Sequence, residues 1–319
     1  MEKDFNKKLI NAVLSNMPPK VKAASYLSDV LKLSRESVYR RIRGEIPFTI
    51  DEFAKLSVAL GFSFDEIIGN ANFGHAFFEF FANEKPPNEM YATMLEKYLE
   101  LLEKIETTQM VDSVMSINRI PPNFYMLFDN LHKFVFYKWL NQYSGVPSNL
   151  HFSDIDVPPE IMSLQKRIRF NFSKLKRRTL ILDPNTFLNQ VKEIQYYYKM
   201  KLLNDEDLSL LKQEMNELVG LLENAAKTGT LGAYKTKTDI YLSFLSISAN
   251  TCYYAYDDKV RTIIWIFIVN PIIIHNTNIS DMQKKWLNFL KRQSTLISQS
   301  NEISQTEFFN QQRKYIEML

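Results

Sequence analysis

The amino-acid sequence predicts an all-α N-terminal domain followed by an α+β domain that is mostly helical and holds a small antiparallel sheet. Two observations predict this. Capping residues divide the first part of the chain into short helical segments. After Thr238, helical periodicity gives way to β-branched and aromatic residues that alternate in part. The predicted organisation is a domain at residues 1–70, a junction at residues 71–88 and a second domain at residues 89–319.

Five short helices are expected in the first domain. Apolar residues at helical spacing mark the first two, at residues 5–14 and 23–31. Ser34 is a suitable N-cap for a third helix, Arg35–Arg43, which Gly44 ends.

Capping boxes open the last two of these helices. Thr49–Glu52 opens the fourth helix, which Gly61 ends, and Ser63–Glu66 opens the fifth. Three consecutive helices therefore have explicit start signals, which makes the helical interpretation of this domain specific.

The third helix separates two kinds of side chain. At 100° per residue, one arc of about 140° holds five residues: Arg35, Glu36, Tyr39, Arg40 and Arg43. Val38 lies on the other side and Ile42 at the edge, so the helix can pack inward and present polar groups outward. Reading base edges in a DNA major groove requires this, because arginine can bridge O6 and N7 of guanine and glutamate can accept from N4 of cytosine.

Charge supports the same interpretation. The whole chain carries only +3, but Lys32–Arg43 has five bases and one acid. Lys20 and Lys22, at the start of the second helix, are placed to contact a phosphate with help from the helix dipole.

The sequence from Leu31 to Thr49 resembles the helix-turn-helix of the lambda-repressor-like, or Xre-type, DNA-binding family. The Ser34-to-Gly44 interval, Pro47 and the capped fourth helix carry the resemblance, which covers about 60 of the 319 residues, roughly residues 10–70. It implies that early residues of the third helix read bases. The DNA-binding residues predicted from the resemblance and from the pattern together are Lys20, Lys22, Ser34, Arg35, Glu36, Ser37, Tyr39, Arg40 and Arg43.

Two positions depart from that family's pattern. Ser28 stands where alanine is common, and Lys32 stands where the turn often has glycine. A lysine at positive φ costs roughly 1 kcal/mol, so we expect the turn to differ slightly.

The second domain is expected to surround its sheet with helices. An aromatic patch at residues 73–81 is interpreted as a docking helix in the junction. Helix Glu89–Glu106 has apolar residues in a 3-4-3-4 rhythm, typical of packing within its own domain or, alternatively, of a dimer contact. Further helices are expected at residues 127–143, 185–201, 205–228, 281–293 and 306–319, and extended segments at residues 110–117, 179–182, 239–256, 260–269 and 272–274. Asp257 and Asp258 are interpreted as the turn of a hairpin.

Composition and motifs argue against several other classes. With 23 Phe, 16 Tyr and 3 Trp in 319 residues, the chain is not disordered throughout. One cysteine, Cys252, excludes an internal disulfide and a cysteine-based metal site, and we interpret it as a buried structural thiol. The N-terminus lacks a secretory signal, and the apolar stretch at residues 262–274 is shorter than the about 20 residues that span a bilayer. We therefore expect a cytoplasmic protein.

No pattern of catalytic or metal-binding residues stands out. The four histidines, His75, His132, His151 and His275, have no metal-ligand spacing, and no nucleotide-binding or hydrolase motif occurs. We therefore predict no enzyme activity, no cofactor and no metal. The basic run Lys166–Arg178 holds seven bases and no acid, and we interpret it as a solvated face rather than a site.

These features predict a sequence-specific DNA-binding transcription regulator, similar in plan to bacterial one-component regulators. Its partners would be double-stranded DNA and a second copy of the chain, because one small helix reads only a few base pairs. The second domain would sense a small-molecule or protein effector or form the dimer. The alternative is a protein-interaction module whose helix-turn-helix does not read DNA, and an enzymatic second domain is a more distant one.

Overall fold

The computed structural model describes residues 2–18, 21–62, 78–80, 85–106, 111–142, 149–256, 259–266, 270–274 and 276–319. The chain divides into two compact units, Met1–Phe77 and Phe78–Leu319, called here the N-terminal and the C-terminal unit. The expected helix beginning at Ser63, and the turn residues Asp257 and Asp258, lie outside the described residues.

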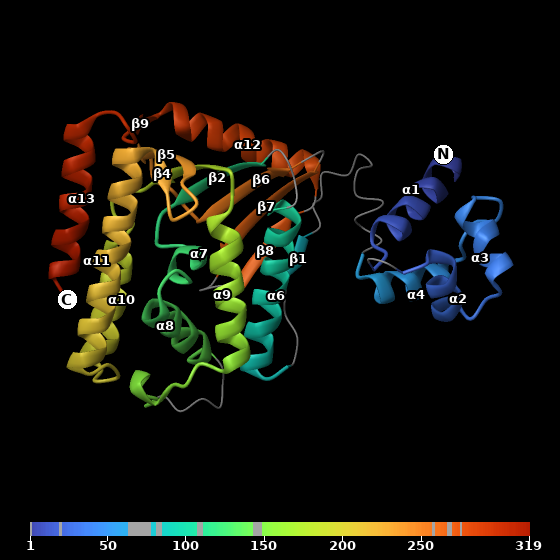
Figure 1. Ribbon diagram of the computed structural model, residues 1–319, viewed down its shortest axis with the longest axis horizontal. Helices are drawn as coiled ribbons and strands as arrows, with labels where there is room; N and C mark the ends of the chain where they lie inside the picture. The colour runs from blue at the N-terminus through green and yellow to red at the C-terminus, as the bar shows by residue number, and fades with distance from the viewer. Residues whose placement is uncertain are drawn as a thin grey trace. The chain divides into compact units, whose positions relative to one another are not determined.

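The N-terminal unit contains the first four expected helices. They are α1 (Glu2–Ser15), α2 (Ala23–Leu31), α3 (Arg35–Ile42) and α4 (Ile50–Leu60) (Figure 1). The predicted caps are confirmed. The Ser34 hydroxyl accepts from the Ser37 N–H at 3.2 Å, and Thr49 and Glu52 form a reciprocal capping box. Gly61 ends α4 in the left-handed conformation that glycine adopts without strain.

A small apolar core holds these helices together. Leu27 of α2, Val38 of α3 and Leu56 of α4 are fully buried within it, together with residues of α1. Each helix therefore buries one face and leaves the opposite face in solvent, as the sequence pattern predicts.

The turn between α2 and α3 keeps the left-handed geometry despite having a lysine. Lys32 has φ 55° and ψ 41°, and its N–H donates to the Ser28 carbonyl oxygen. Lys32 therefore takes the left-handed conformation that glycine adopts without strain. The lysine accepts the strained conformation, at a cost of about 1 kcal/mol relative to glycine.

The C-terminal unit is built on one mixed sheet, which confirms the expected α+β fold class. Within the described residues the strand order is β1-β8-β7-β6-β2-β3-β5-β4, and β9 also pairs with β5. The strands are β1 (Phe78–Phe80), β2 (Val111–Ile117), β3 (Arg177–Leu182), β4 (Thr230–Leu231), β5 (Thr236–Ser243), β6 (Thr251–Tyr256), β7 (Lys259–Ile266), β8 (Asn270–Ile274) and β9 (Ser294–Leu296).

This sheet is larger than the sequence suggested. The expected hairpin is present as β6 and β7, with Tyr256 opposite Lys259. The extended segment expected at residues 239–256 is divided between two strands, β5 and β6, which do not pair with each other. β3 instead lies between β2 and β5 and is parallel to both, with Leu180 opposite Met115 and Ile240. Part of the junction is also extended, because β1 pairs with β8 where a docking helix was expected.

Helices cover both faces of the sheet. They are α6 (Pro87–Glu106), α7 (Pro122–Tyr125), α8 (Asp129–Leu140), α9 (Pro159–Ser173), α10 (Leu188–Lys199), α11 (Asp205–Thr228), α12 (Thr277–Arg292) and α13 (Glu302–Glu317), with a 3-10 turn at Phe152–Asp154. Alternate residues of the strands enter two cores. Leu180 and Leu182 join the main core with α6, α8, α9, α11 and α13, whereas Ile181 joins a smaller one with Leu287 and Leu290 of α12.

The apolar seam of α6 is used inside the C-terminal unit. Five residues at the predicted spacing are buried in the main core: Tyr91, Met94, Tyr98, Leu101 and Ile105. α6 runs beside α9 (Figure 1). Cys252 is also fully buried, as predicted. Among the helices the structure describes, none is long and apolar enough to cross a membrane.

Candidate nucleic-acid interface

The exposed side of α3 carries the residues that the sequence placed in one arc. Arg35, Glu36, Tyr39, Arg40 and Arg43 are all exposed, whereas Val38 on the opposite side is fully buried. The predicted two-sided helix is therefore confirmed. α3 is anchored by its apolar side and presents three guanidinium groups, a carboxylate and a phenol to solvent.

Arg41 belongs to the anchoring side. Its guanidinium makes a bidentate pair with Glu52, with Nε–Oε2 and Nη2–Oε1 distances of 2.8 and 2.7 Å, and Nη1 donates to the Ser37 carbonyl oxygen. The two side chains are only 12% and 13% exposed. Since Glu52 also closes the capping box of α4, this pair fixes α3 against α4. Partial burial opposes ionisation of Glu52, but the hydrogen bonds from Arg41 and from Thr49 N–H hold its pKa below the usual range.

A carboxylate that the sequence reasoning missed lies beside the predicted interface. Glu45 is 3.5 Å from Nε of Arg40 and 3.3 Å from Nη1 of Arg43. All three side chains are at least 44% exposed. Glu45 follows the helix-ending Gly44 and so lies outside any helical pattern, which is why the periodicity did not reveal it. Arg43 also lies over the Tyr39 ring, 5.9 Å from its centre.

The remaining predicted residues of the turn are partly engaged within the protein. Nη2 of Arg35 is 3.4 Å from the Ser25 hydroxyl of α2. The Ser34 and Ser37 hydroxyls are 3.0 Å apart, and the Ser34 hydroxyl caps α3. These serines therefore shape the start of the helix, while Glu36 has no hydrogen-bond or ion-pair partner among the described residues.

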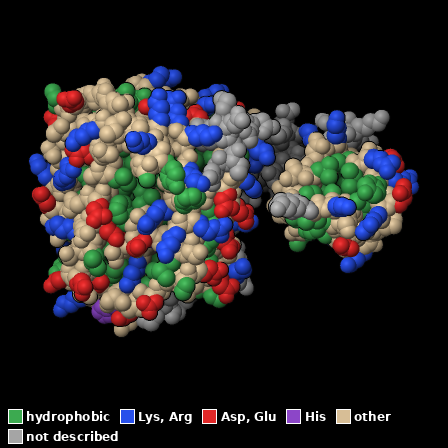
Figure 2. Space-filling view, viewed as in Figure 1, with side chains coloured by type: hydrophobic (Ala, Val, Ile, Leu, Met, Phe, Trp, Pro, Cys, Tyr) green, Lys and Arg blue, Asp and Glu red, His purple; other side chains and the backbone are tan. Residues whose placement is uncertain are grey.

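The structure describes one of the two lysines predicted to contact a phosphate. Lys22 immediately precedes α2 and is exposed, and its side chain makes no capping hydrogen bond. Lys20 lies outside the described residues. On the face of the N-terminal unit visible in Figure 2, both basic and acidic side chains border an apolar area.

An apolar stripe on α4 was not singled out from the sequence. Ile50 and Val58 are 86% and 87% exposed, and Ala54 between them is exposed as well. Spacings of four residues place the three side chains on one side of the helix. Exposed apolar residues are ordinary when scattered, but a row on one short helix is typical of a contact surface.

The comparison with known families agrees with the helical arrangement. Residues 8–76 match the BetR domain family, a helix-turn-helix type of DNA-binding domain. The match covers the N-terminal unit and does not extend into the sheet. No curated protein and no solved structure matches the chain. Residues 8–76 are thus similar to a helix-turn-helix DNA-binding domain.

Proposed function

We propose that the protein is a sequence-specific DNA-binding transcription regulator that acts in the cytoplasm and docks its α3 in the major groove in the manner of Xre-type domains. One observation carries the proposal. α3 is held from behind by Val38 and Arg41 and exposes a row of groups that can read base edges, in a segment that matches a DNA-binding domain family.

The position of each group suggests its role. Arg35, Glu36, Tyr39 and Arg40 lie on the first two turns of α3, where a recognition helix meets bases. Arg43 follows the last turn of α3, and Lys22 precedes α2, so both are assigned to backbone phosphates. Ser34 and Ser37, already bonded to each other, are assigned to positioning of the helix rather than to base contacts.

The active species would be a homodimer on a two-fold symmetric site. One α3 covers only a few base pairs, and two copies are needed for useful specificity. The exposed stripe Ile50, Ala54 and Val58 on α4 supports this, because a second copy could cover it through the same surface.

Selection of bound fragments from random DNA by the full chain tests the proposal. We expect a two-fold symmetric motif that the Arg35→Ala/Arg40→Ala variant fails to enrich. The matched control is Lys7→Ala/Lys55→Ala, which removes two exposed charges from the same unit but leaves α3 intact. This control should lower affinity on all sequences and recover the same motif.

Two further measurements separate base reading from other roles. Arg40→Ala should cost about 1–3 kcal/mol on the preferred site and much less on unrelated DNA if Arg40 bridges a guanine. Affinity should also fall steeply with salt. Binding that is absent or independent of salt, in the full chain and in a fragment of residues 1–77 alike, would favour the protein-interaction alternative.

A further inference from the structure

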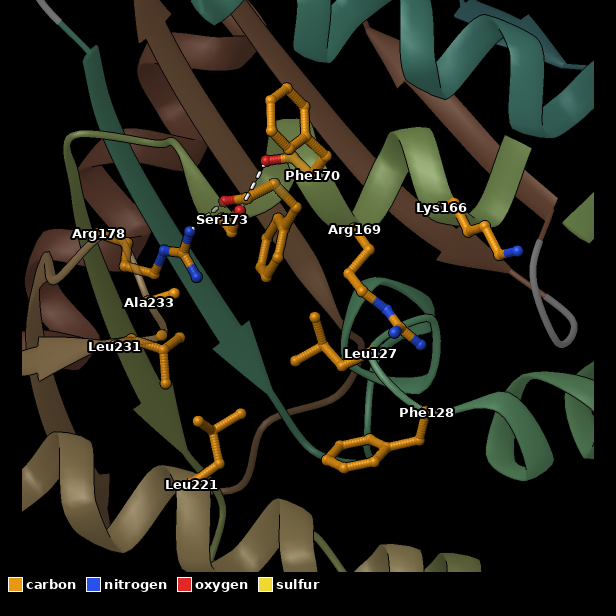
Figure 3. Close-up of a pocket in the computed structure, with 12 residues that line it drawn as sticks. Leu127, Phe128, Lys166, Arg169, Phe170, Ser173, Arg178, Leu221, Leu231 and Ala233 are labelled. Carbon is orange, nitrogen blue, oxygen red and sulfur yellow. Dashed lines mark hydrogen bonds between the residues drawn. The ribbon is translucent and has the colours of Figure 1, made fainter. Parts of the chain in front are cut away.

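The C-terminal unit contains an open cavity of about 480 Å³ between α9, the start of β3 and α11 (Figure 3). Its volume is within the range of small-molecule sites, about 300–1,000 Å³. Most of the lining is apolar: Leu127, Phe128, Phe170, Phe172, Leu221 and Leu231. Phe170 is 48% exposed at the rim, so the cavity opens to solvent.

A buried guanidinium is part of this lining. Arg178 is only 2% exposed, and its side chain comes from β3 on the same face as Leu180. Nη2 donates to the Phe172 carbonyl oxygen, and the guanidinium carbon is 4.1 Å from the centre of the Phe172 ring. Nε is buried and has no hydrogen-bond partner within the described parts of the chain. A buried unpaired donor destabilises the folded state, and a charged one does so more strongly.

No carboxylate neutralises Arg178 among the residues the structure describes. The groups that interact electrostatically with the Arg178 guanidinium are the phenols of Tyr254 and Tyr98 and the thiol of Cys252. Burial raises the pKa of both phenols, and it raises the pKa of Cys252 to about 12, so none of these groups carries a charge at neutral pH. The same burial lowers the pKa of Arg178 to about 10, which leaves the guanidinium protonated and its charge unpaired.

The adjacent arginine shows the contrast. Arg177 is on the other face of β3, is 52% exposed and pairs with Asp239 at 3.1 Å. Arg169, whose guanidinium lies near Leu127 and Phe128 in Figure 3, pairs with Asp129 at 2.9 Å and is 40% exposed. Lys166 also lines the cavity but is exposed, and its side chain extends to the side away from Arg178 in the same view. Arg178 is therefore the buried cation of this cavity, and no carboxylate pairs with it among the described residues. The interpretation of the whole basic run as a solvated face is wrong at this residue, because Arg178 is buried.

We propose that this cavity binds a small organic monocarboxylate with an apolar body. The carboxylate would accept from Arg178, and the apolar body would lie against Leu127, Leu221 and Leu231. A single buried guanidinium matches one negative charge, whereas a phosphate dianion would leave a second charge in an apolar site. The proposal concerns ligand binding by the C-terminal unit and does not depend on DNA binding.

Calorimetric titration of the full chain with octanoate tests the assignment, with 1-octanol and octyl phosphate as chemically matched probes. Octanoate should bind, and 1-octanol should bind about tenfold more weakly or worse because it cannot pair with the cation. Tighter binding of octyl phosphate than of octanoate would overturn the choice of a carboxylate. Absence of octanoate binding would identify Arg178 as a purely structural cation and overturn the site itself.

Two substitutions on β3 form a matched pair for the same titration. Arg178→Met should weaken octanoate binding about tenfold or more and leave 1-octanol unchanged. Arg177→Met removes the same charge one residue away on the opposite face, and it should leave octanoate binding unchanged. Equal affinity of octanoate for the Arg178→Met and unaltered proteins would overturn the proposal.

A third variant tests the cavity independently of Arg178. Leu221→Trp on α11 places a larger side chain in the space and retains the guanidinium. It should abolish binding of both octanoate and 1-octanol, and the result remains decisive if Arg178→Met does not fold. Unchanged octanoate binding by Leu221→Trp would show that the ligand binds elsewhere.

Discussion

Replacing Glu45 by glutamine should make the protein bind DNA more tightly. In the free protein the Glu45 carboxylate is 3.5 Å from Arg40 and 3.3 Å from Arg43, both assigned to the DNA interface. DNA phosphates and base edges must compete with it for these guanidinium groups. The glutamine keeps the size of the side chain and removes the charge.

The size of the effect follows from the exposure of the pairs. The three side chains are 44–60% exposed, so each ion pair contributes only about 0.5 kcal/mol. Release of Arg40 and Arg43 from both ion pairs should favour DNA binding by about 1 kcal/mol, which is roughly a fivefold gain in affinity. Loss of a negative charge close to the phosphates acts in the same direction. The gain should shrink as salt rises, because salt screens exposed pairs.

Fluorescence anisotropy of the selected DNA site, measured over a salt series, is a suitable assay. The control is Asp29→Asn, which removes an exposed carboxylate of α2 that has no charged partner among the described residues. Glu45→Gln should exceed this control by about fivefold at low salt. A gain no larger than that of Asp29→Asn would refute the competition, and a loss of affinity would show that Glu45 holds the arginines in their binding geometry.

Three further predictions concern stability. Lys32→Gly should stabilise the N-terminal unit by about 0.5–1 kcal/mol by relieving the left-handed strain, while Lys32→Ala should not; amide hydrogen exchange of α2 and α3 measures both. Arg41→Met should lower the free energy of unfolding of the N-terminal unit, measured at the same amides, by about 2 kcal/mol because it leaves Glu52 largely buried without its ion-pair partner. Additive effects of Arg41→Met and Glu52→Gln in a double-mutant cycle would contradict this. Burial lowers the pKa of His132 to about 4, so the folded state resists protonation and loses stability as pH falls from about 6.5 toward 4. Between pH 7.5 and 5.5 this loss should be about 1 kcal/mol in urea titrations followed by tryptophan fluorescence, and His132→Gln should lack it.

Local signals were predictable from the sequence because they act over a few residues. Ser34 and Thr49 mark helix starts through hydrogen bonds to backbone three residues away, and both caps are present. The inward position of Val38 follows from helical periodicity alone. These features define α3 and its exposed row, and therefore most of the candidate interface.

Long-range pairing was not predictable in the same way. Nothing in the sequence of β3 shows that it lies between β2 and β5, because parallel partners come from distant segments. The ion pairs of Glu45 depend on how the chain turns after Gly44. Arg177 and Arg178 are adjacent arginines, but successive residues of a strand lie on opposite faces. Arg177 is therefore exposed to solvent, whereas Arg178 lines a cavity.

The sheet order also has a consequence for biosynthesis. β3 requires β5 on one side, and β5 in turn pairs with β9, close to the last helix. The C-terminal unit thus has a high contact order and cannot complete its sheet until nearly all of it has been translated. Among the described residues, the core of the N-terminal unit is formed by its own short helices. We therefore expect the N-terminal unit to fold while the sheet is still being translated, and we expect a chain that stops before Ser294 to keep this unit while β5 lacks its β9 neighbour.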